Sequence, residues 1–191
     1  MNEWLSRLRT TLEPVLSEAD PRPKISAYHD MPYAIFRYPP EDEFAMRTEI
    51  GLLRTRLSQK GKDITVISLA ECLDEALEAH APIERLADAE RDVSLAKAIE
   101  TVHEVLASYA PLVDLVINKL PPNPDPLRNM VFIVRAGALF SLYRVFSLLE
   151  QLKGHVNIPA VLFYPGEQDG GAGLRFMNVI DAEHNYRPKI F

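Results

Sequence analysis

Residues 130–164 read MVFIVRAGALFSLYRVFSLLEQLKGHVNIPAVLFY, and this stretch decides the fold of the chain. Its two ends, 130–134 and 160–164, are short apolar runs of the kind found in fully buried strands. Between them a helix is expected, because apolar residues recur every three or four positions: Leu142, Phe146, Leu149 and Leu152. A strand, a helix and a second strand in this order predict a βαβ unit with parallel strands.

The same alternation extends along the rest of the chain. Two further strands are expected at 33–38 and 64–69. Pro165-Gly166 is expected to turn the chain, and residues 174–177 are expected to pair back as a hairpin across the loop 167–173. These elements predict an α/β fold with a mostly parallel sheet of four to five strands, flanked by helices.

The helices are marked by apolar stripes and by prolines. The N-terminal helix is expected within residues 1–19, with Pro14 kinking or ending it. A second helix follows Glu41 and ends near Gly61. A third region begins at Glu71, and a stripe along 95–120 has a 4-3-4-3 rhythm that favours packing on other helices. Pro111 interrupts this stripe, which predicts two stacked helices or one kinked helix.

Length and composition favour one domain. The chain has 191 residues, 47% of them hydrophobic and 25% charged, which fits a single globular domain over 1–191. The proline-rich run 121–126 is expected to be a stiff connector within this domain. The one cysteine, Cys72, excludes an internal disulfide, and its apolar neighbours favour a buried structural thiol.

Charge argues against broad nucleic-acid binding. The net charge is −6, and residues 1–127 hold 14 Lys and Arg against 22 Asp and Glu. Broad contact with a phosphate backbone needs clustered positive charge, so direct DNA binding is not expected. No long apolar run predicts a membrane span, and charged residues interrupt the N-terminal stripe, so a cytoplasmic protein is expected.

No complete catalytic, metal or nucleotide motif is present. Gly61-Lys62-Asp63 lacks the earlier glycine and the hydroxyl residue of a phosphate-binding loop, and no Gly-x-Ser-x-Gly elbow occurs. Glu100 and His103 are spaced to share a metal on a helix, but no second such pair exists to complete a di-metal site. We therefore expect no enzyme activity, cofactor or metal.

The candidate site lies where two strands end. Arg135 and Gly137 follow the strand 130–134, and Tyr164 and Gly166 lie at the end of the strand 160–164. Ligands of doubly wound sheets bind outside the carboxyl ends of the strands. Arg135, with Arg144, would there meet a partner's carboxylate or a phosphate. Alternatively, Arg135 pairs with an internal acid and Gly137 only allows a tight turn.

The C-terminal third resembles the BrxB family of bacterial BREX phage-defence systems. The segments that carry this resemblance are Val131 to Phe140, Tyr143-Arg144, Leu148 to Leu152, Ile158 to Gly166, Leu174-Arg175-Phe176 and Asn185 to Lys189. The resemblance implies an α/β domain shaped like nucleotide-binding folds but without a phosphate-binding loop. It also implies a subunit of a multi-protein complex.

Two functions from different classes follow. The resemblance implies a non-catalytic assembly subunit that binds a companion, with PglZ favoured and PglX or BrxC as other choices. The alternative is a nucleotide- or DNA-responsive module, which requires Arg135, Arg144, Arg175 and Arg187 to converge on one cleft.

Overall fold

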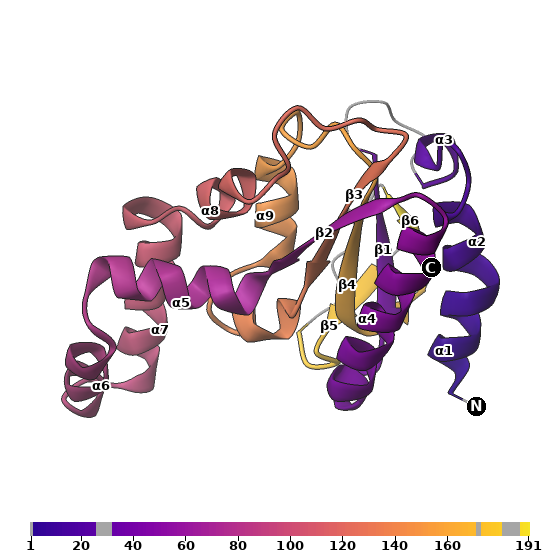
Figure 1. Ribbon diagram of the computed structural model, residues 1–191. Helices are drawn as coiled ribbons and strands as arrows, with labels where there is room; N and C mark the ends of the chain where they lie inside the picture. The colour runs from indigo at the N-terminus through magenta and orange to yellow at the C-terminus, as the bar shows by residue number, and fades with distance from the viewer. Residues whose placement is uncertain (1, 26–31, 171–172, 181–187) are drawn as a thin grey trace.

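The computed structural model describes residues 2–25, 32–170, 173–180 and 188–191. A twisted sheet forms its centre, with helices on both faces (Figure 1). Five strands follow the order β2-β3-β4-β1-β6, and every neighbouring pair on this path is parallel. Their bounds are β1 Tyr33–Tyr38, β2 Asp63–Ser68, β3 Asn129–Val134, β4 Ala160–Asp169 and β6 Lys189–Ile190. The predicted fold class, a single α/β domain with a mostly parallel sheet, is confirmed.

One face of the sheet is covered by the N-terminal helix and by α4 (Glu43–Gln59). The N-terminal helix consists of α1 (Glu3–Arg7), a π-helical segment (Leu8–Leu12) and α2 (Glu13–Leu16). Side chains alternate along each strand, so every second residue joins this core, among them Ala34, Phe36, Phe132 and Phe163.

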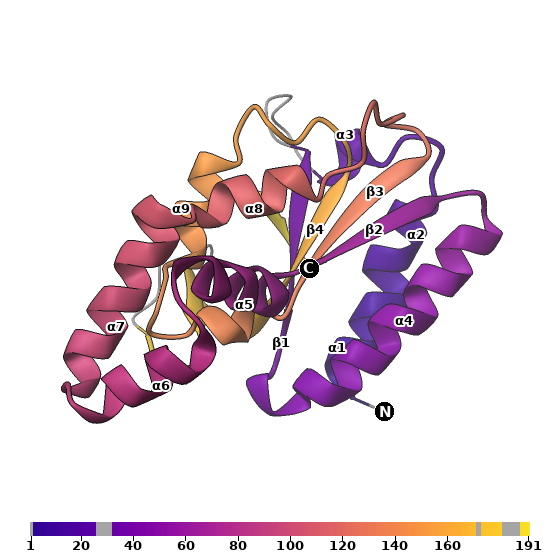
Figure 2. The same cartoon turned by 60° about the vertical axis from the view of Figure 1, so that its left-hand side comes forward.

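The other face is covered by helices from the middle of the chain. They are α5 (Leu69–His80), a π-helical segment (Val105–Tyr109), α8 (Leu112–Asn118) and α9 (Val145–Gln151). Two more helices, α6 (Ile83–Arg91) and α7 (Leu95–Glu104), extend away from the sheet, as Figure 2 shows. A short α3 (Arg22–Ile25) precedes β1. The chain thus leaves β1 over one face and leaves β2 and β3 over the opposite face.

The N-terminal helix passes through its proline. Pro14 lies in the first turn of α2, and the helix continues to Leu16. A proline has no N–H to donate and its ring crowds the preceding turn. The wider π-helical turn at Leu8–Leu12, directly before it, accommodates both effects.

Gly61 ends α4 as expected. Its φ is +83°, and its N–H donates to Ser58 O at 3.0 Å while the Lys62 N–H donates to Leu57 O at 3.1 Å. These two bonds form a Schellman motif, which requires the left-handed backbone that glycine adopts without strain. The next strand, β2, ends at Ser68, one residue earlier than expected, because the Ser68 hydroxyl caps α5.

The stripe along 95–120 forms two helical stretches. The first runs through α7 and the π-helical segment to Tyr109, and the second, α8, begins after Pro111. The break at the proline gives two helices rather than one kinked helix. Residues 121–128 form an irregular connector that contains no helix or strand.

The prediction of a turn at Pro165-Gly166 is wrong. β4 continues through both residues to Asp169, and its end pairs antiparallel with β5 (Gly173–Phe176), with Gly166 opposite Phe176. The hairpin itself is confirmed, but its loop is shorter than 167–173. Pro165 is tolerated because β4 has left the central ladder to β3 by then.

Candidate functional site

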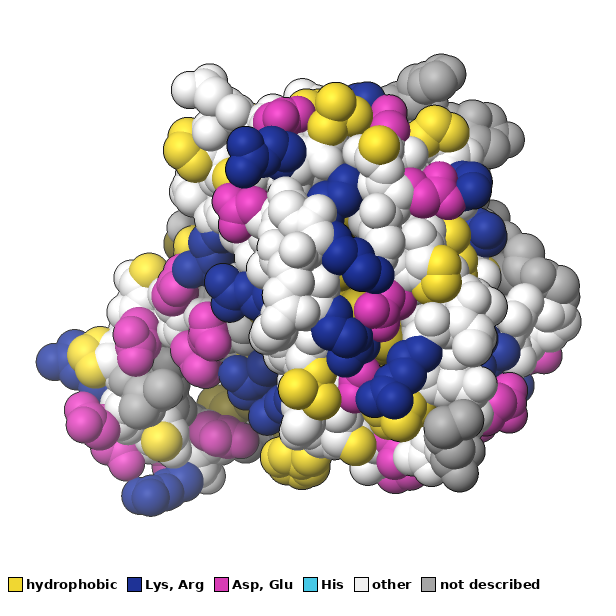
Figure 3. Space-filling view, turned by 45° about the vertical axis from the view of Figure 1, so that its right-hand side comes forward, with side chains coloured by type: hydrophobic (Ala, Val, Ile, Leu, Met, Phe, Trp, Pro, Cys, Tyr) yellow, Lys and Arg dark blue, Asp and Glu magenta, His cyan; other side chains and the backbone are white. Residues whose placement is uncertain are grey.

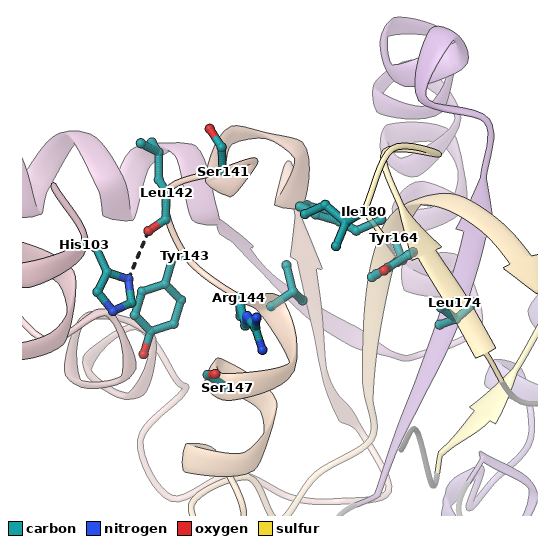
Figure 4. Close-up of a pocket in the computed structure, with 11 residues that line it drawn as sticks. His103, Ser141, Leu142, Tyr143, Arg144, Ser147, Tyr164, Leu174 and Ile180 are labelled. Atoms are coloured by element: carbon teal, nitrogen blue, oxygen red, sulfur yellow. Dashed lines mark hydrogen bonds between the residues drawn. The ribbon is translucent and has the colours of Figure 1, made fainter. Parts of the chain in front are cut away.

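A pocket of about 300 Å³ lies at the carboxyl end of the sheet, on the face covered by α9. Four segments far apart in the sequence line it, and Figure 4 shows their side chains around one opening. The lining residues are His103 of α7, Ser141 to Val145 and Ser147 around the start of α9, Tyr164 of β4, Leu174 and Phe176 of β5, and Ile180.

The segment between β3 and α9 is held in place by its backbone. Arg135 has φ +59° and ψ +37°, and it begins a 3₁₀ helix at Ala136–Leu139. Ser141 also has a positive φ of 61°. Such conformations are uncommon outside glycine and persist where the surrounding packing enforces them. They bend the chain across the strand ends, which brings Ser141 to Arg144 to the pocket.

Aromatic rings make up much of the pocket wall. The rings of His103 and Tyr143 are 5.6 Å apart, and those of Tyr164 and Phe176 are 5.2 Å apart. His103 Nδ1 lies 3.2 Å from Leu142 O, a contact drawn in Figure 4. The Tyr143 hydroxyl accepts a hydrogen bond of 3.2 Å from Gln151 Nε2. These contacts fix the rings, so the pocket is pre-formed.

Arg144 is the cationic group of the pocket. Its side chain is exposed, and it forms no ion pair with any acid in the described part of the chain. The pocket therefore combines an apolar aromatic wall with one guanidinium available to an incoming acceptor.

Arg135 and Gly137 lie beside this pocket but do not line it. Arg135 Nη1 donates a hydrogen bond of 3.4 Å to Ser68 Oγ, a hydroxyl at the end of β2. No internal acid among the described residues pairs with it. A Cβ on Gly137 would lie 3.4 Å from Met177 Sδ and 3.6 Å from Pro165 Cγ, so this position packs closely against the hairpin.

The other expected residues are dispersed. Arg175 pairs with Asp169 within the hairpin at 3.1 Å, and Gly166 lines a different pocket. Arg187 lies outside the described residues. Of the three expected arginines that the structure describes, Arg144 lines the pocket at α9, and Arg135 and Arg175 do not.

Sequence reasoning missed several lining residues. The sequence favours a surface or groove-lining position for His103 over a metal site, but it does not indicate which groove, and it gives no sign that Phe176 or Ile180 lines a pocket. Glu100, which has metal-ligand spacing to His103, pairs with Lys97 at 2.9 Å, and no group of three or more potential metal ligands occurs in the described ranges. Asp181 and His184 are also three residues apart, and they lie outside these ranges.

Across the parts of the chain that the structure describes, no helix has both the length and the apolar character to cross a bilayer.

Comparison with known proteins places the chain in a family. Residues 65–190 match the family described as "BREX protein BrxB". A protein of Bacillus cereus (strain H3081.97), named BREX protein BrxB, is 25% identical over 179 residues, which cover 91% of this chain and 90% of that protein. No solved structure matches the chain. The family match covers both the sheet from β2 onward and the pocket at α9, and the chain belongs to the BrxB family.

Proposed function

We propose that this protein is a non-catalytic assembly subunit of a BREX phage-defence complex. Its pocket at α9 receives an apolar side chain of a companion protein, for which PglZ is the first choice. Family membership supports a place in a BREX system. The absence of any complete catalytic motif in the sequence supports a role in binding.

The composition of the pocket wall carries the proposal. Aromatic residues and arginine are enriched at the centres of protein interfaces, where a few buried anchors supply most of the binding energy. The aromatic wall consists of Tyr143, Tyr164 and Phe176. The companion's side chain that enters the pocket is the anchor, and Arg144 can pair with a carboxylate next to it. The anchor is therefore expected to be an apolar residue with an acidic neighbour.

The helix beside the pocket extends this surface. α7 is amphipathic, yet none of its ten residues is buried. Leu95 is 72% exposed, and Tyr109, in the π-helical segment that continues α7, is 66% exposed. Exposed apolar side chains on one helix are typical of surfaces that are covered by a partner. His103 of α7 lines the pocket, so this helix adjoins it.

Co-purification with tagged PglZ at moderate salt tests the proposal. Ile180 lines the pocket and is 37% exposed, whereas its neighbour Val179 is 70% exposed and does not line it. Ile180→Asp should weaken binding about tenfold or more, because a charge in the apolar wall opposes burial of the companion's side chain, and losing a central interface contact costs about 2 kcal/mol. Val179→Asp introduces the same charge one residue away and should bind like the unaltered protein.

A second pair of variants tests the cation. Arg144→Ala should weaken binding, and Arg128→Ala, an exposed arginine outside the pocket, should leave it unchanged. Failure of the unaltered protein to bind PglZ, PglX or BrxC would contradict the assembly role. Equal loss with Ile180→Asp and Val179→Asp would contradict the pocket as the interface.

The nucleotide- or DNA-responsive alternative receives less support at this pocket. It requires several arginines in one cleft, whereas Arg135, Arg144 and Arg175 do not line a common pocket.

A further inference from the structure

A second pocket, of about 320 Å³, lies on the other side of the same sheet edge. Its lining includes Glu3, Trp4 and Arg7 of α1, Arg37 of β1, Asp42, and Glu167 at the end of β4. None of these residues lines the pocket at α9. Its volume is at the lower end of the range for small-molecule sites, about 300–1,000 Å³.

The position of this pocket is one that α/β sheets use for ligands. β1 and β4 are neighbours, and the pocket lies where both strands end. The chain leaves β1 over one face and leaves β2 and β3 over the other, so the direction of the connections changes beside this crevice. Crevices at such points, outside the carboxyl ends of the strands, are where doubly wound sheets bind ligands.

Two arginines, Arg7 and Arg37, lie together in this pocket, and nearby acids compensate their positive charges only in part. Arg7 Nη2 donates to Arg37 O at 2.6 Å, and its nearest acid, Glu3, is 3.7 Å away with a side chain that is 92% exposed. Arg37 forms no ion pair within the described ranges. The Nε atoms of both arginines are buried without a hydrogen-bond partner there. Burial, and next the charge of Arg37, lower the pKa of Arg7.

Three acids line the pocket beside this pair, and two of them, Glu3 and Glu167, are exposed to solvent, where water and salt screen their charge. The third, Asp42, accepts a hydrogen bond of 2.8 Å from Trp4 Nε1. The buried Nε atoms of Arg7 and Arg37 still lack an acceptor among the described residues, and an oxyanion in the pocket would supply one.

Arginines are also frequent on the neighbouring surface, although the whole chain is acidic. The N-terminal helix (3–16) and α4 together hold five Arg against four Glu. Figure 3, which brings this side of the molecule forward, shows Lys and Arg side chains gathered along its middle. A surface of this kind attracts anions and raises their local concentration.

We propose that this pocket binds the phosphate group of a small hydroxylated phosphate monoester, with Arg7 and Arg37 as the phosphate-binding residues. A phosphate monoester carries nearly two negative charges, which match the two guanidinium charges. A single carboxylate carries only one negative charge and matches them less well. Asp42 and Glu167 repel additional anionic groups and accept hydrogen bonds from ligand hydroxyls. The site is independent of the proposed assembly role.

Calorimetric titration of the full chain with inorganic phosphate, ribose 5-phosphate, adenosine monophosphate and succinate tests this site. Phosphate should bind, and at least one of the two esters should bind more tightly than phosphate alone. Succinate binding as tightly as phosphate, or no binding by any phosphate compound, would overturn the proposal. The two esters distinguish a sugar phosphate from a nucleotide as the ligand.

Three variants locate the binding. Arg37→Gln should weaken phosphate binding about tenfold, as expected for loss of a hydrogen bond to a charged group. Glu167→Gln should tighten it, because a repulsive charge is removed from the rim. Arg54→Gln removes the same charge from an exposed position on α4 and should have little effect. Equal weakening by Arg37→Gln and Arg54→Gln would show attraction to the general basic surface and would overturn the pocket.

Discussion

Gly166 shows how a single residue holds the hairpin that carries part of the pocket wall. A Cβ at this position would lie 2.2 Å from Arg175 O and 2.9 Å from Tyr164 Cε1, and φ is +157°. Gly166→Ala should therefore lower the free energy of unfolding by about 2–4 kcal/mol, through backbone strain and overpacking. Gly51→Ala on α4 meets nothing within 4 Å and should instead raise stability by about 0.5–1 kcal/mol. Denaturant titration of both variants measures the contrast.

Cys72 is the second informative residue. It is fully buried in the core of the α9 face, and burial raises the pKa of its thiol to about 11. Because the thiolate is the reactive form, Cys72 should react with a thiol reagent at pH 8 far more slowly in the native protein than in denaturant. The thiol of the unfolded chain ionises at a lower pH than the buried thiol. The stability that the protonated thiol contributes is therefore lost as pH rises from about 9 through about 11. Rapid labelling of the native protein would contradict the buried position.

At the scale of elements, a charge network joins the N-terminal helix to α4. Glu49 is 5% exposed and accepts from Arg9 at 3.2 Å and from Arg56 at 2.9 Å. Arg56 also bonds Glu13 at 2.8 Å. Glu49→Ala should cost about 2 kcal/mol, less than a fully buried pair because both arginines are partly exposed. Glu100→Ala, which removes an exposed partner of Lys97, should leave the unfolding temperature nearly unchanged. Thermal unfolding of the two variants compares them directly.

The elements that sequence predicts well are those with a long apolar pattern. β1, β2, β3 and the first half of β4 are apolar runs, and the helices have stripes with prolines or glycines near their ends. The continuation of β4 was missed because Pro165-Gly166 is typical of turns, while only the close approach of Arg175 reveals why glycine is needed in a strand. β6 was missed because two residues, Lys189–Ile190, are too short for any periodicity.

The candidate sites are built from elements that are far apart in the sequence, so sequence patterns could predict them only in part. The rule that ligands bind at strand ends grouped Arg144 with Tyr164, and the structure places both residues in the lining of one pocket. It gave no means of adding His103 or Ile180, because their proximity depends on how α7 and the segment after β5 pack. The second pocket joins α1 to β1 and β4, and neither the strand order nor the place of α1 follows from local pattern.

The two ends of the described chain meet at β1, which makes the sheet depend on its last residue. The Phe191 N–H donates to Ile35 O at 2.8 Å, and the Arg37 N–H donates to Phe191 O at 3.2 Å. The Phe191 side chain is 7% exposed and belongs to the core that also contains Trp4 and Leu8. Phe191→Ala leaves the backbone bonds in place but removes a ring from this core, so it should cost about 3 kcal/mol.

Val179→Ala, at a residue that is 70% exposed, is the matched control and should change stability by no more than about 0.5 kcal/mol. Denaturant titration followed by intrinsic fluorescence suits this test, because Trp4 lies in the same core as Phe191. If Phe191→Ala unfolds at the same denaturant concentration as the control, β6 contributes only an edge strand. A large loss of stability in Phe191→Ala means that Phe191 closes the core between the N-terminal helix and β1. Phosphate binding should then weaken as well, because Arg7 and Arg37 lie on these two elements.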